Sequence, residues 1–200
     1  LEHLDASRHG PPIYYFSEMP RDARATQALL GLMRKPVIVH SYARALMTWG
    51  RTPGAYWEAA VRKKKRKEIG RLEKRLEEIG PVQCERSTGI AEVDSWIDAF
   101  LALEASGWKG KRGSALARGG ATEAFFRDAL TAALAQGRAE MLRLKAGEQT
   151  IAMLVNFVAP PGAFSFKIAY DEAFARYSPG VLIEKANLTK LNDPAFGWMD

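Results

Sequence analysis

The sequence has 200 residues, 47% of them hydrophobic, and carries a formal net charge of +6. This composition suffices for one globular domain, or one domain plus part of another. The sequence contains no run of about 18 apolar residues that could span a membrane. The single cysteine, Cys84, excludes an internal disulfide and a cysteine-rich metal site, and the three histidines show no ligand spacing. The positive charge favours anionic partners such as phosphates, coenzymes or nucleic acid.

The first 50 residues differ in pattern from the rest of the chain. Residues 13–16 and 37–39 predict short strands, and residues 21–33 predict a helix. Because these elements cannot enclose a core, we interpret residues 1–53 as the end of a preceding lobe or a flanking segment. Residues 54–200 form the main domain. The chain begins without methionine and stops abruptly, so we expect a fragment of a longer protein, truncated at its C-terminus.

Residues 55–79 predict one long helix. Residues 62–67 are six consecutive basic residues, which cover every side of a helix and must project into water or meet an anion. A solvated basic helix and a helix that contacts the phosphates of nucleic acid or a coenzyme both remain open. The second half of the segment has a narrow apolar seam at helical spacing, formed by Ile69, Leu72, Leu76 and Ile79.

A strand predicted over residues 81–86 precedes a helix whose apolar stripe contains one carboxylate, Glu104. A buried carboxylate is costly unless it is paired, so Glu104 is either salt-bridged for structure or held near a reacting group. We expect it to face a cation or a cleft. Residues 107–111, which include Trp108 and Lys109, predict a flexible loop able to clasp a ligand, or a helix C-cap with a hydrophobic plug.

A helix predicted from Thr122 to Ala135 leads into three strands, at 140–145, 150–158 and 164–170. The turns between the strands are short enough for hairpins, so we expect an antiparallel meander. The strand 150–158 is nearly all apolar and should lie in the middle. In the third strand, one set of alternating positions is aromatic or apolar: Phe164, Phe166, Ile168 and Tyr170.

A polar loop over residues 172–177 connects this third strand to a helix. We expect the side chain of Ser178 to cap that helix by accepting a hydrogen bond from a first-turn amide. Pro179 has no N–H to lose, and Gly180 leaves the remaining amides accessible. A helix N-terminus of this kind can bind an anion, although a capped helix without a ligand has the same pattern.

From Pro81 on, the order of elements resembles the GNAT N-acyltransferase fold. The segments FLALEASGWKGKRGSAL (100–116), AEMLRLKAGEQTIAMLVNF (139–157) and KIAYDEAFARYSPGVLIEKAN (167–187) resemble the GNAT branch linked to bacterial cellulose and polysaccharide biosynthesis. The basic helix at 62–80 is similar to that branch as well, and the resemblance covers about residues 55–200. It implies an α/β (α+β) fold, with a mixed, mainly antiparallel sheet flanked by helices, and the double-lobed architecture of the FemABX-type peptidyltransferases.

The resemblance also implies an activity. A cytoplasmic enzyme would move an acyl group, acetyl in the first instance, from acyl-CoA to an amine or hydroxyl of a sugar or polysaccharide precursor, without a metal. The pantetheine would lie along Lys167, Ile168 and Ala169. The sequence departs from the common Gln/Arg-x-x-Gly-x-Gly/Ala loop, because Ala175 and Ser178 occupy its first two defined positions. The pyrophosphate would meet the turn formed by Arg176, Ser178, Pro179, Gly180 and Val181.

Attack on the thioester needs a base, donors for the oxyanion and often an acid for the thiolate. Glu104 is the candidate base or orienting group. Tyr170, next to Asp171, is a candidate acid or else a core aromatic. Trp108 and Lys109 are candidates for acceptor binding.

Two other functions remain open. One is aminoacyl-tRNA-dependent transfer, as in the FemABX-type enzymes. The other is a non-enzymatic nucleic-acid-binding module that uses the basic helix, although residues 62–67 contain no aromatic side chain to stack on bases.

Overall fold

The computed structural model describes residues 13–200 except positions 34, 88 and 119, and leaves out the side chains of Lys109 and Arg118. The chain forms two compact units, Leu1–Ala43 and Arg44–Asp200. In the described part of the first unit, helix α2 (Arg24–Leu32) is present as predicted, with no buried residue. Residues 13–16 and 37–39 are not strands, contrary to prediction. A β-branched or aromatic run needs a partner strand to supply its hydrogen bonds, and these runs pair with none among the described residues.

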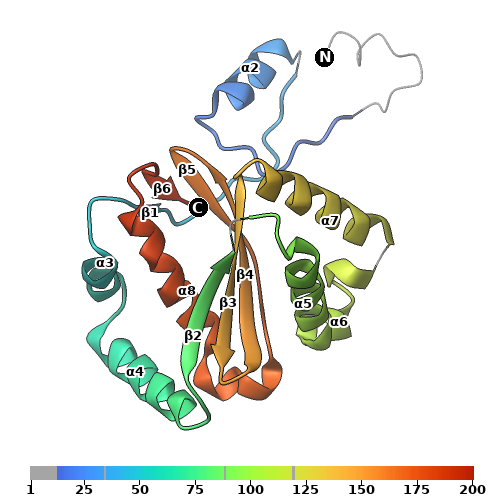
Figure 1. Ribbon diagram of the computed structural model, residues 1–200. Coiled ribbons are helices and arrows are strands. Elements are labelled where there is room, and N and C mark those ends of the chain that lie inside the picture. Colours follow the sequence, from blue (N-terminus) through green and yellow to red (C-terminus); the bar gives the residue numbers. More distant parts are fainter. Residues whose placement is uncertain (1–12, 34, 88, 119) are drawn as a thin grey trace. The chain divides into compact units, whose positions relative to one another are not determined.

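The second unit is built on a six-stranded sheet with the order β1-β6-β5-β4-β3-β2 (Figure 1). Neighbouring strands are antiparallel except β5 and β6, which are parallel. The predicted meander is confirmed, because β4 pairs with β3 on one edge and β5 on the other. The strands are β1 (Met47–Thr48), β2 (Val82–Ser87), β3 (Ala139–Ala146), β4 (Gln149–Ala159), β5 (Gly162–Tyr170) and β6 (Trp198–Met199).

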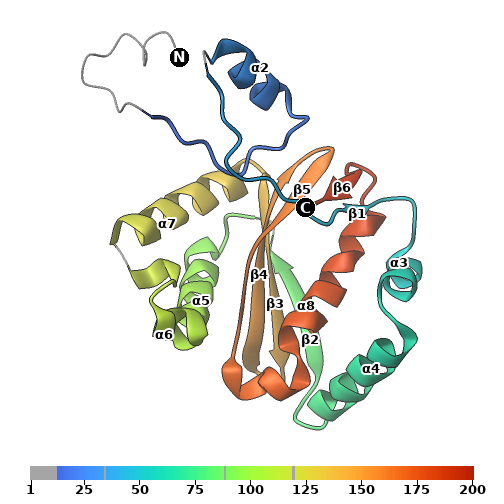
Figure 2. The ribbon, with the colours of Figure 1, turned by 180° about the vertical axis from the view of Figure 1, so that it is seen from behind.

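Helices cover both faces of this sheet, as the two opposite views show (Figures 1 and 2). One face carries α5 (Val93–Ser106), α6 (Trp108–Arg112), η1 (Leu116–Arg118) and α7 (Gly120–Ala135). The other carries α3 (Pro53–Ala60), α4 (Lys63–Glu77) and α8 (Pro179–Asn187), with the short 3-10 helices η2 (Glu172–Tyr177) before α8 and η3 (Leu188–Asn192) after it. The expected mixed, mainly antiparallel α/β fold is therefore confirmed.

The long helix predicted over residues 55–79 is in fact two helices, α3 and α4. The backbone is extended at Val61 (φ −116°, ψ 124°), which ends α3. The guanidinium of Arg66 donates to the carbonyl oxygens of Glu58 (2.8 Å) and Val61 (2.6 Å), so it satisfies acceptors that the end of α3 leaves open. Thr52 caps the start of α3 by accepting a hydrogen bond from the amide of Ala55.

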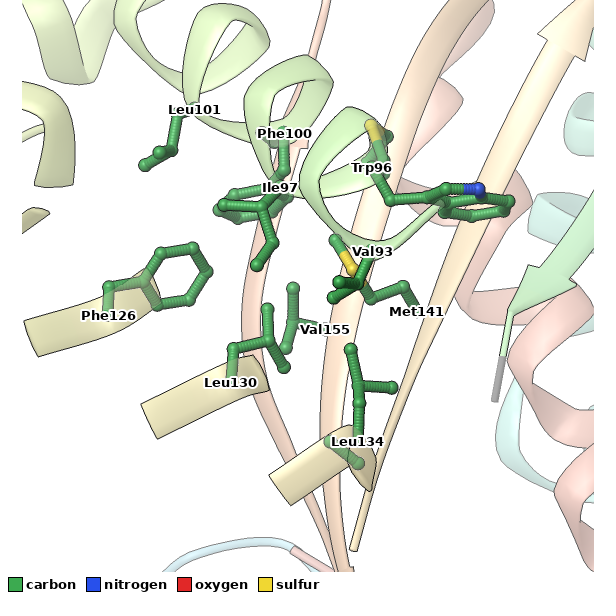
Figure 3. Close-up of a cluster of buried hydrophobic side chains, with 13 residues drawn as sticks. Val93, Trp96, Ile97, Phe100, Leu101, Phe126, Leu130, Leu134, Met141 and Val155 are labelled. Carbon is green, nitrogen blue, oxygen red and sulfur yellow. The ribbon is translucent and has the colours of Figure 1, made fainter. Parts of the chain in front are cut away.

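Each face of the sheet has its own hydrophobic cluster. On the first face, α5 and α7 pack on β3 and β4 (Figure 3), where Ile97, Phe100 and Leu130 are fully buried. On the second face, Ile69 and Leu76 of α4 pack with Ile183 of α8 on the opposite side of the same strands. The apolar seam predicted for α4 is thus confirmed at Ile69 and Leu76, which are buried. Its last position, Ile79, is exposed and lies beyond the helix.

A buried polar network joins α8 and η3 to the sheet. Asn156 of β4 donates to Glu140 of β3 and to Asn187 of α8, both at 2.9 Å. Lys190 donates to the second oxygen of Glu140 at 3.1 Å, and Arg86 pairs with the first at 2.6 Å. Burial acts to raise the pKa of Glu140, but the hydrogen bond from Asn156 and the charges of Arg86 and Lys190 together hold this pKa below its usual range. The carboxylate therefore remains ionised inside the protein.

We expect Glu140→Gln to lower the free energy of unfolding by about 3 kcal/mol near neutral pH, because the buried Lys190 ammonium then loses its buried carboxylate partner and keeps only the more exposed Asp193, 3.5 Å away. A lowered pKa stabilises the fold above the unfolded-state pKa of about 4.3, and this contribution disappears as the pH falls through the lower folded-state value. The difference between parent and variant should therefore shrink in acid. Urea denaturation across pH measures it. Glu148→Gln, at a fully exposed carboxylate, is the matched control, and an equal loss in both variants would contradict the prediction.

Candidate functional site

The two edges of β5 are paired very differently. One edge pairs with β4 from Gly162 to Tyr170. The other pairs with β6 only at Gly162 and Ala163, followed by one hydrogen bond from the Ser165 amide to the carbonyl oxygen of Asp200 (2.8 Å). Beyond Ser165, no described strand pairs with this second edge. Because no described strand covers this edge between Phe166 and Tyr170, an extended ligand can lie alongside it as an added strand would.

A β-bulge interrupts β5 close to the point where its pairing with β6 ends. Val155 lies opposite Lys167 and Asn156 lies opposite Ser165, so Phe166 is an extra residue. The expected alternation of four apolar residues on one face is therefore wrong, since a bulge reverses the side-chain direction. Phe166 contacts the rings of Phe126 and Phe157 on the α7 face. Two other members, Ile168 and Tyr170, pack in the cluster under α4 and α8.

The side chain of Lys167 forms an ion pair with Glu104 of α5. Glu104 is 2% exposed. Its Oε1 accepts a hydrogen bond from the Lys167 ammonium (2.8 Å), and its Oε2 accepts one from the Leu116 amide (2.8 Å). The expectation that Glu104 faces a cation is thus confirmed. Because both oxygens are engaged, this carboxylate links α5, η1 and β5, and it holds Lys167 in a defined position.

The segment containing Trp108 and Lys109 is helical, so the predicted flexible loop is wrong. The alternative, a helix C-cap, is confirmed at Gly107, which ends α5, but exposed Trp108 is not a buried plug. The segment forms α6, where the exposed ring of Trp108 carries the Arg112 guanidinium 5.3 Å from its centre. Lys111 binds Glu172 of η2 at 2.5 Å, and this hydrogen bond lowers the pKa of Glu172. The helix thus lies beside the end of β5. The side chain of Lys109, a predicted acceptor ligand, lies outside the described residues.

Asp171 and Tyr170 have structural partners at the end of β5. The carboxylate of Asp171 accepts a hydrogen bond from the Ala173 amide (2.9 Å) and one from the Gln149 side chain (3.1 Å), so it caps η2 and ties it to the start of β4. The segment predicted as a polar loop is therefore a capped 3-10 helix. Tyr170 is half-buried in the cluster with Ile168, which fits a core aromatic as well as a proton donor.

The helix start at Ser178 differs from the predicted cap. Ser178 adopts a left-handed conformation (φ 56°, ψ 51°), and its side chain makes no capping hydrogen bond. Instead, its carbonyl oxygen accepts from the amides of Val181 (2.9 Å) and Leu182 (3.1 Å). Pro179 is the first residue of α8 as predicted. Among the described residues the amide of Gly180 makes no backbone hydrogen bond, whereas the amides of Val181 and Leu182 do. Of the amides in the predicted anion site, that of Gly180 is therefore the main one left to bind an anion.

Arg176 lies beside this turn, with its guanidinium 4.8 Å from the centre of the Tyr177 ring. It shares a hollow of about 230 Å³ with Arg75 and Glu78 at the end of α4. Two cations from different elements therefore flank the turn before α8. Sequence reasoning missed Arg75, because only the packing of α4 on η2 brings it close.

The described residues contain no cluster of three or more His, Cys, Asp or Glu side chains that could hold a metal ion. In the same part of the chain, every helix is too short or too polar to cross a membrane.

Comparisons with known proteins bear on the fold and the family of this chain. The chain is similar in fold to the crystal structure of FemX, with a TM-score of 0.53 at 10% sequence identity, over 78% of this chain and 51% of that one. It thus spans about half the length of that structure. The ribosomal-protein-alanine N-acetyltransferase from Brucella melitensis biovar Abortus 2308 gives a TM-score of 0.33 at 14% identity, over 60% of this chain and 79% of that chain. No curated protein matches the sequence. The family model described as "Acetyltransferase (GNAT) domain" matches residues 63–187. This match covers more than half of the sequence, so the chain belongs to the GNAT acetyltransferase domain family.

Proposed function

We propose that this chain contains the acyl-CoA site of an acyltransferase, which moves an acyl group, acetyl in the first instance, to an amine or hydroxyl acceptor. The observation that carries the proposal is the edge of β5 that no described strand covers beyond Ser165, which leads directly into η2 and the N-terminus of α8. A pantetheine arm has two amide groups and can hydrogen-bond to this edge like an added strand. Its pyrophosphate then reaches the turn at the end of the strand.

In this arrangement the pantetheine lies alongside Lys167, Ile168 and Ala169. The pyrophosphate meets the Gly180 amide at the positive end of the α8 dipole, and Arg176 supplies a positive charge beside it. Ser178, Pro179 and Val181 shape this turn. A side chain at Gly180 would meet Ile168 and Tyr170 at 3.7 Å and 3.8 Å, so Gly180 lies directly against the end of the proposed pantetheine edge.

Glu104 and Lys167 act together in this proposal. Both oxygens of Glu104 already accept hydrogen bonds, so it orients Lys167 rather than taking the acceptor's proton. An ammonium has three protons, and the hydrogen bond to Glu104 uses one of them. Lys167 can therefore stabilise the oxyanion that develops during acyl transfer. Tyr170 packs against Gly180, at the pyrophosphate end of the arm, so in this arrangement it shapes that end and does not reach the thiolate at the other end. Asp171 caps η2, the 3-10 helix that precedes the pyrophosphate turn.

The acceptor enters from the α6 side. The exposed ring of Trp108 offers a face for stacking, and Lys109 follows it in the helix. A sugar or polysaccharide precursor fits an aromatic face of this kind, consistent with the sequence resemblance to the polysaccharide-linked branch.

The direct test is ligand-induced stabilisation. We expect acetyl-CoA or a longer acyl-CoA to raise the melting temperature, with a stabilisation of about 2.7 kcal/mol at a concentration 100 times Kd. Desulfo-CoA, which lacks only the sulfur, should also bind because the proposed contacts involve the arm and the phosphates. No shift with any acyl-CoA, together with a larger shift caused by aminoacyl-tRNA than by the same tRNA without its amino acid, would contradict the proposal and favour the tRNA-dependent alternative.

The Gly180→Asp variant should remain folded and lose acyl-CoA binding. Its new Cβ would meet Ile168 and Tyr170 at ordinary contact distances, and a carboxylate in the first turn suits the helix dipole. The added charge repels the pyrophosphate, so we expect at least a tenfold rise in Kd by calorimetry, or about 1.4 kcal/mol. Gly180→Asn has the same shape without the charge and is the matched control. If Gly180→Asp binds as tightly as Gly180→Asn, the pyrophosphate does not lie at this turn.

The Glu104–Lys167 pair can be tested by a double-mutant cycle. Glu104→Gln keeps the volume and can still accept from the Leu116 amide, but it removes the charge that orients Lys167. We expect a coupling energy of about 1–2 kcal/mol between Glu104→Gln and Lys167→Met in urea denaturation. Turnover should fall at least tenfold in each single variant, with little further loss in the double variant. A stability loss with unchanged turnover would assign the pair to structure alone.

A further inference from the structure

The basic charge of this protein is concentrated on α4. Residues 62–78 contain nine basic and four acidic residues, a net charge of +5 out of +6 for the whole chain. The remainder is therefore close to neutral. If the basic pI arose from general composition, the positive charge would be spread over the surface. Its concentration on one helix identifies that helix as the place where an anionic partner is attracted.

The cations of α4 differ in their surroundings. Some have local partners: Lys65 pairs with Glu68 at 3.0 Å, and Arg66 binds the carbonyls at the end of α3. Four others form what we call the basic stripe. They are exposed, and within the described part of the chain they make no ion pair. The basic stripe consists of Lys64, Lys67, Arg71 and Lys74.

Helix geometry places the basic stripe in a straight line. Its members are separated by three, four and three residues, so they follow one another along one side of α4 over about 15 Å. Together with Gly70 they line a shallow hollow of about 510 Å³. Nothing lies within 4 Å of the position that a Cβ at Gly70 would occupy, so the middle of this hollow is open.

This arrangement is unfavourable for an isolated helix. Cations three or four residues apart repel one another. The first turn of α4 contains no acidic residue, and its N-cap, Arg62, makes no side-chain capping bond, so positive charge lies at the positive end of the helix dipole. Both effects are relieved when a row of anions binds along the stripe.

The chemistry of the hollow indicates the kind of anion. Its lining is Lys, Arg and Gly only, with no aromatic ring to stack on a base or sugar and no hydroxyl or amide side chain to read sugar hydroxyls. The line of charges fits a linear polymer better than the plane of a membrane. Charge contacts alone are the usual mode of sequence-independent binding to nucleic-acid phosphates.

We propose that the basic stripe of α4 binds the phosphodiester backbone of a nucleic acid without reading its sequence. This activity is separate from the acyl-CoA site proposed above, and its test needs neither coenzyme nor turnover.

The experiment is a fluorescence anisotropy titration of the 200-residue chain with short fluorescein-labelled RNA and DNA duplexes of mixed sequence, over a salt series. Each neutralised phosphate contributes about 0.9 to the slope of log K against log salt, so four contacts should give a slope of about −3.6. The stripe variant, Lys64→Gln/Lys67→Gln/Arg71→Gln/Lys74→Gln, should lose most of this slope and at least tenfold in affinity at low salt. Lys64→Gln/Lys67→Gln should lose about half of the slope.

A matched control removes the same number of exposed cations elsewhere: Arg21, Lys35, Arg51 and Arg138, each to Gln. This control should retain the slope of the parent apart from a small general effect of net charge, and circular dichroism should give the same helix content in all variants. Equal loss in the control and stripe variants would overturn the proposal. So would a parent protein that binds phosphatidylserine vesicles or polygalacturonate more tightly than either duplex at the same salt.

Discussion

Burial of β4 on both faces is the constraint on which the rest of the structure depends. From Ile151 to Asn156 every residue of this strand is buried. A strand of this kind needs hydrogen-bond partners on both edges and an apolar layer on each face. The neighbouring strands β3 and β5 supply the partners through short turns, while α5 with α7 and α4 with α8 supply the two layers. Asn156 is the one polar residue in this run, and its partners Glu140 and Asn187 tie the second layer to the sheet.

In the same sheet, no described strand covers one edge of β5 beyond Ser165, and the polar groups of the candidate site lie near it. The bulge at Phe166 directs Lys167 toward α5, where Glu104 holds it. Bulges are common next to active sites because they redirect a side chain without ending the strand. As a result, the side chain of Lys167 points toward α5 on one face of the sheet, and the strand edge beside it can take an extended ligand.

Charge is distributed unevenly over the second unit. Around the end of β5 the described ion pairs balance one another, as with Glu104 and Lys167 or Lys111 and Glu172. On α4 the basic stripe has no such balance. A site for a reacting ligand benefits from fixed, compensated charges, because these orient groups without attracting unrelated anions. A surface that binds a polyanion benefits instead from a local excess of charge of one sign.

Strong local patterns in the sequence were sufficient to predict the antiparallel meander, the amphipathic helices α5 and α7, and the cation facing Glu104. Period-two and period-3.6 alternation depends only on neighbouring residues, and a carboxylate on an apolar stripe needs a partner wherever it lies. The resemblance to GNAT proteins covered the same region, and the family match agrees with it.

Only the tertiary structure decided the features that depend on residues far apart in the chain. The Phe166 bulge arises from the register between β4 and β5, and the identity of the cation at Glu104 follows from it. The break between α3 and α4 is stabilised by Arg66, which reaches back to carbonyls of the preceding helix. At Ser178 the backbone conformation, rather than the residue type, determined that the side chain does not cap α8. Local sequence carries little information on such points, because register, loop conformation and ion-pair choice are set by packing energies summed over the whole fold.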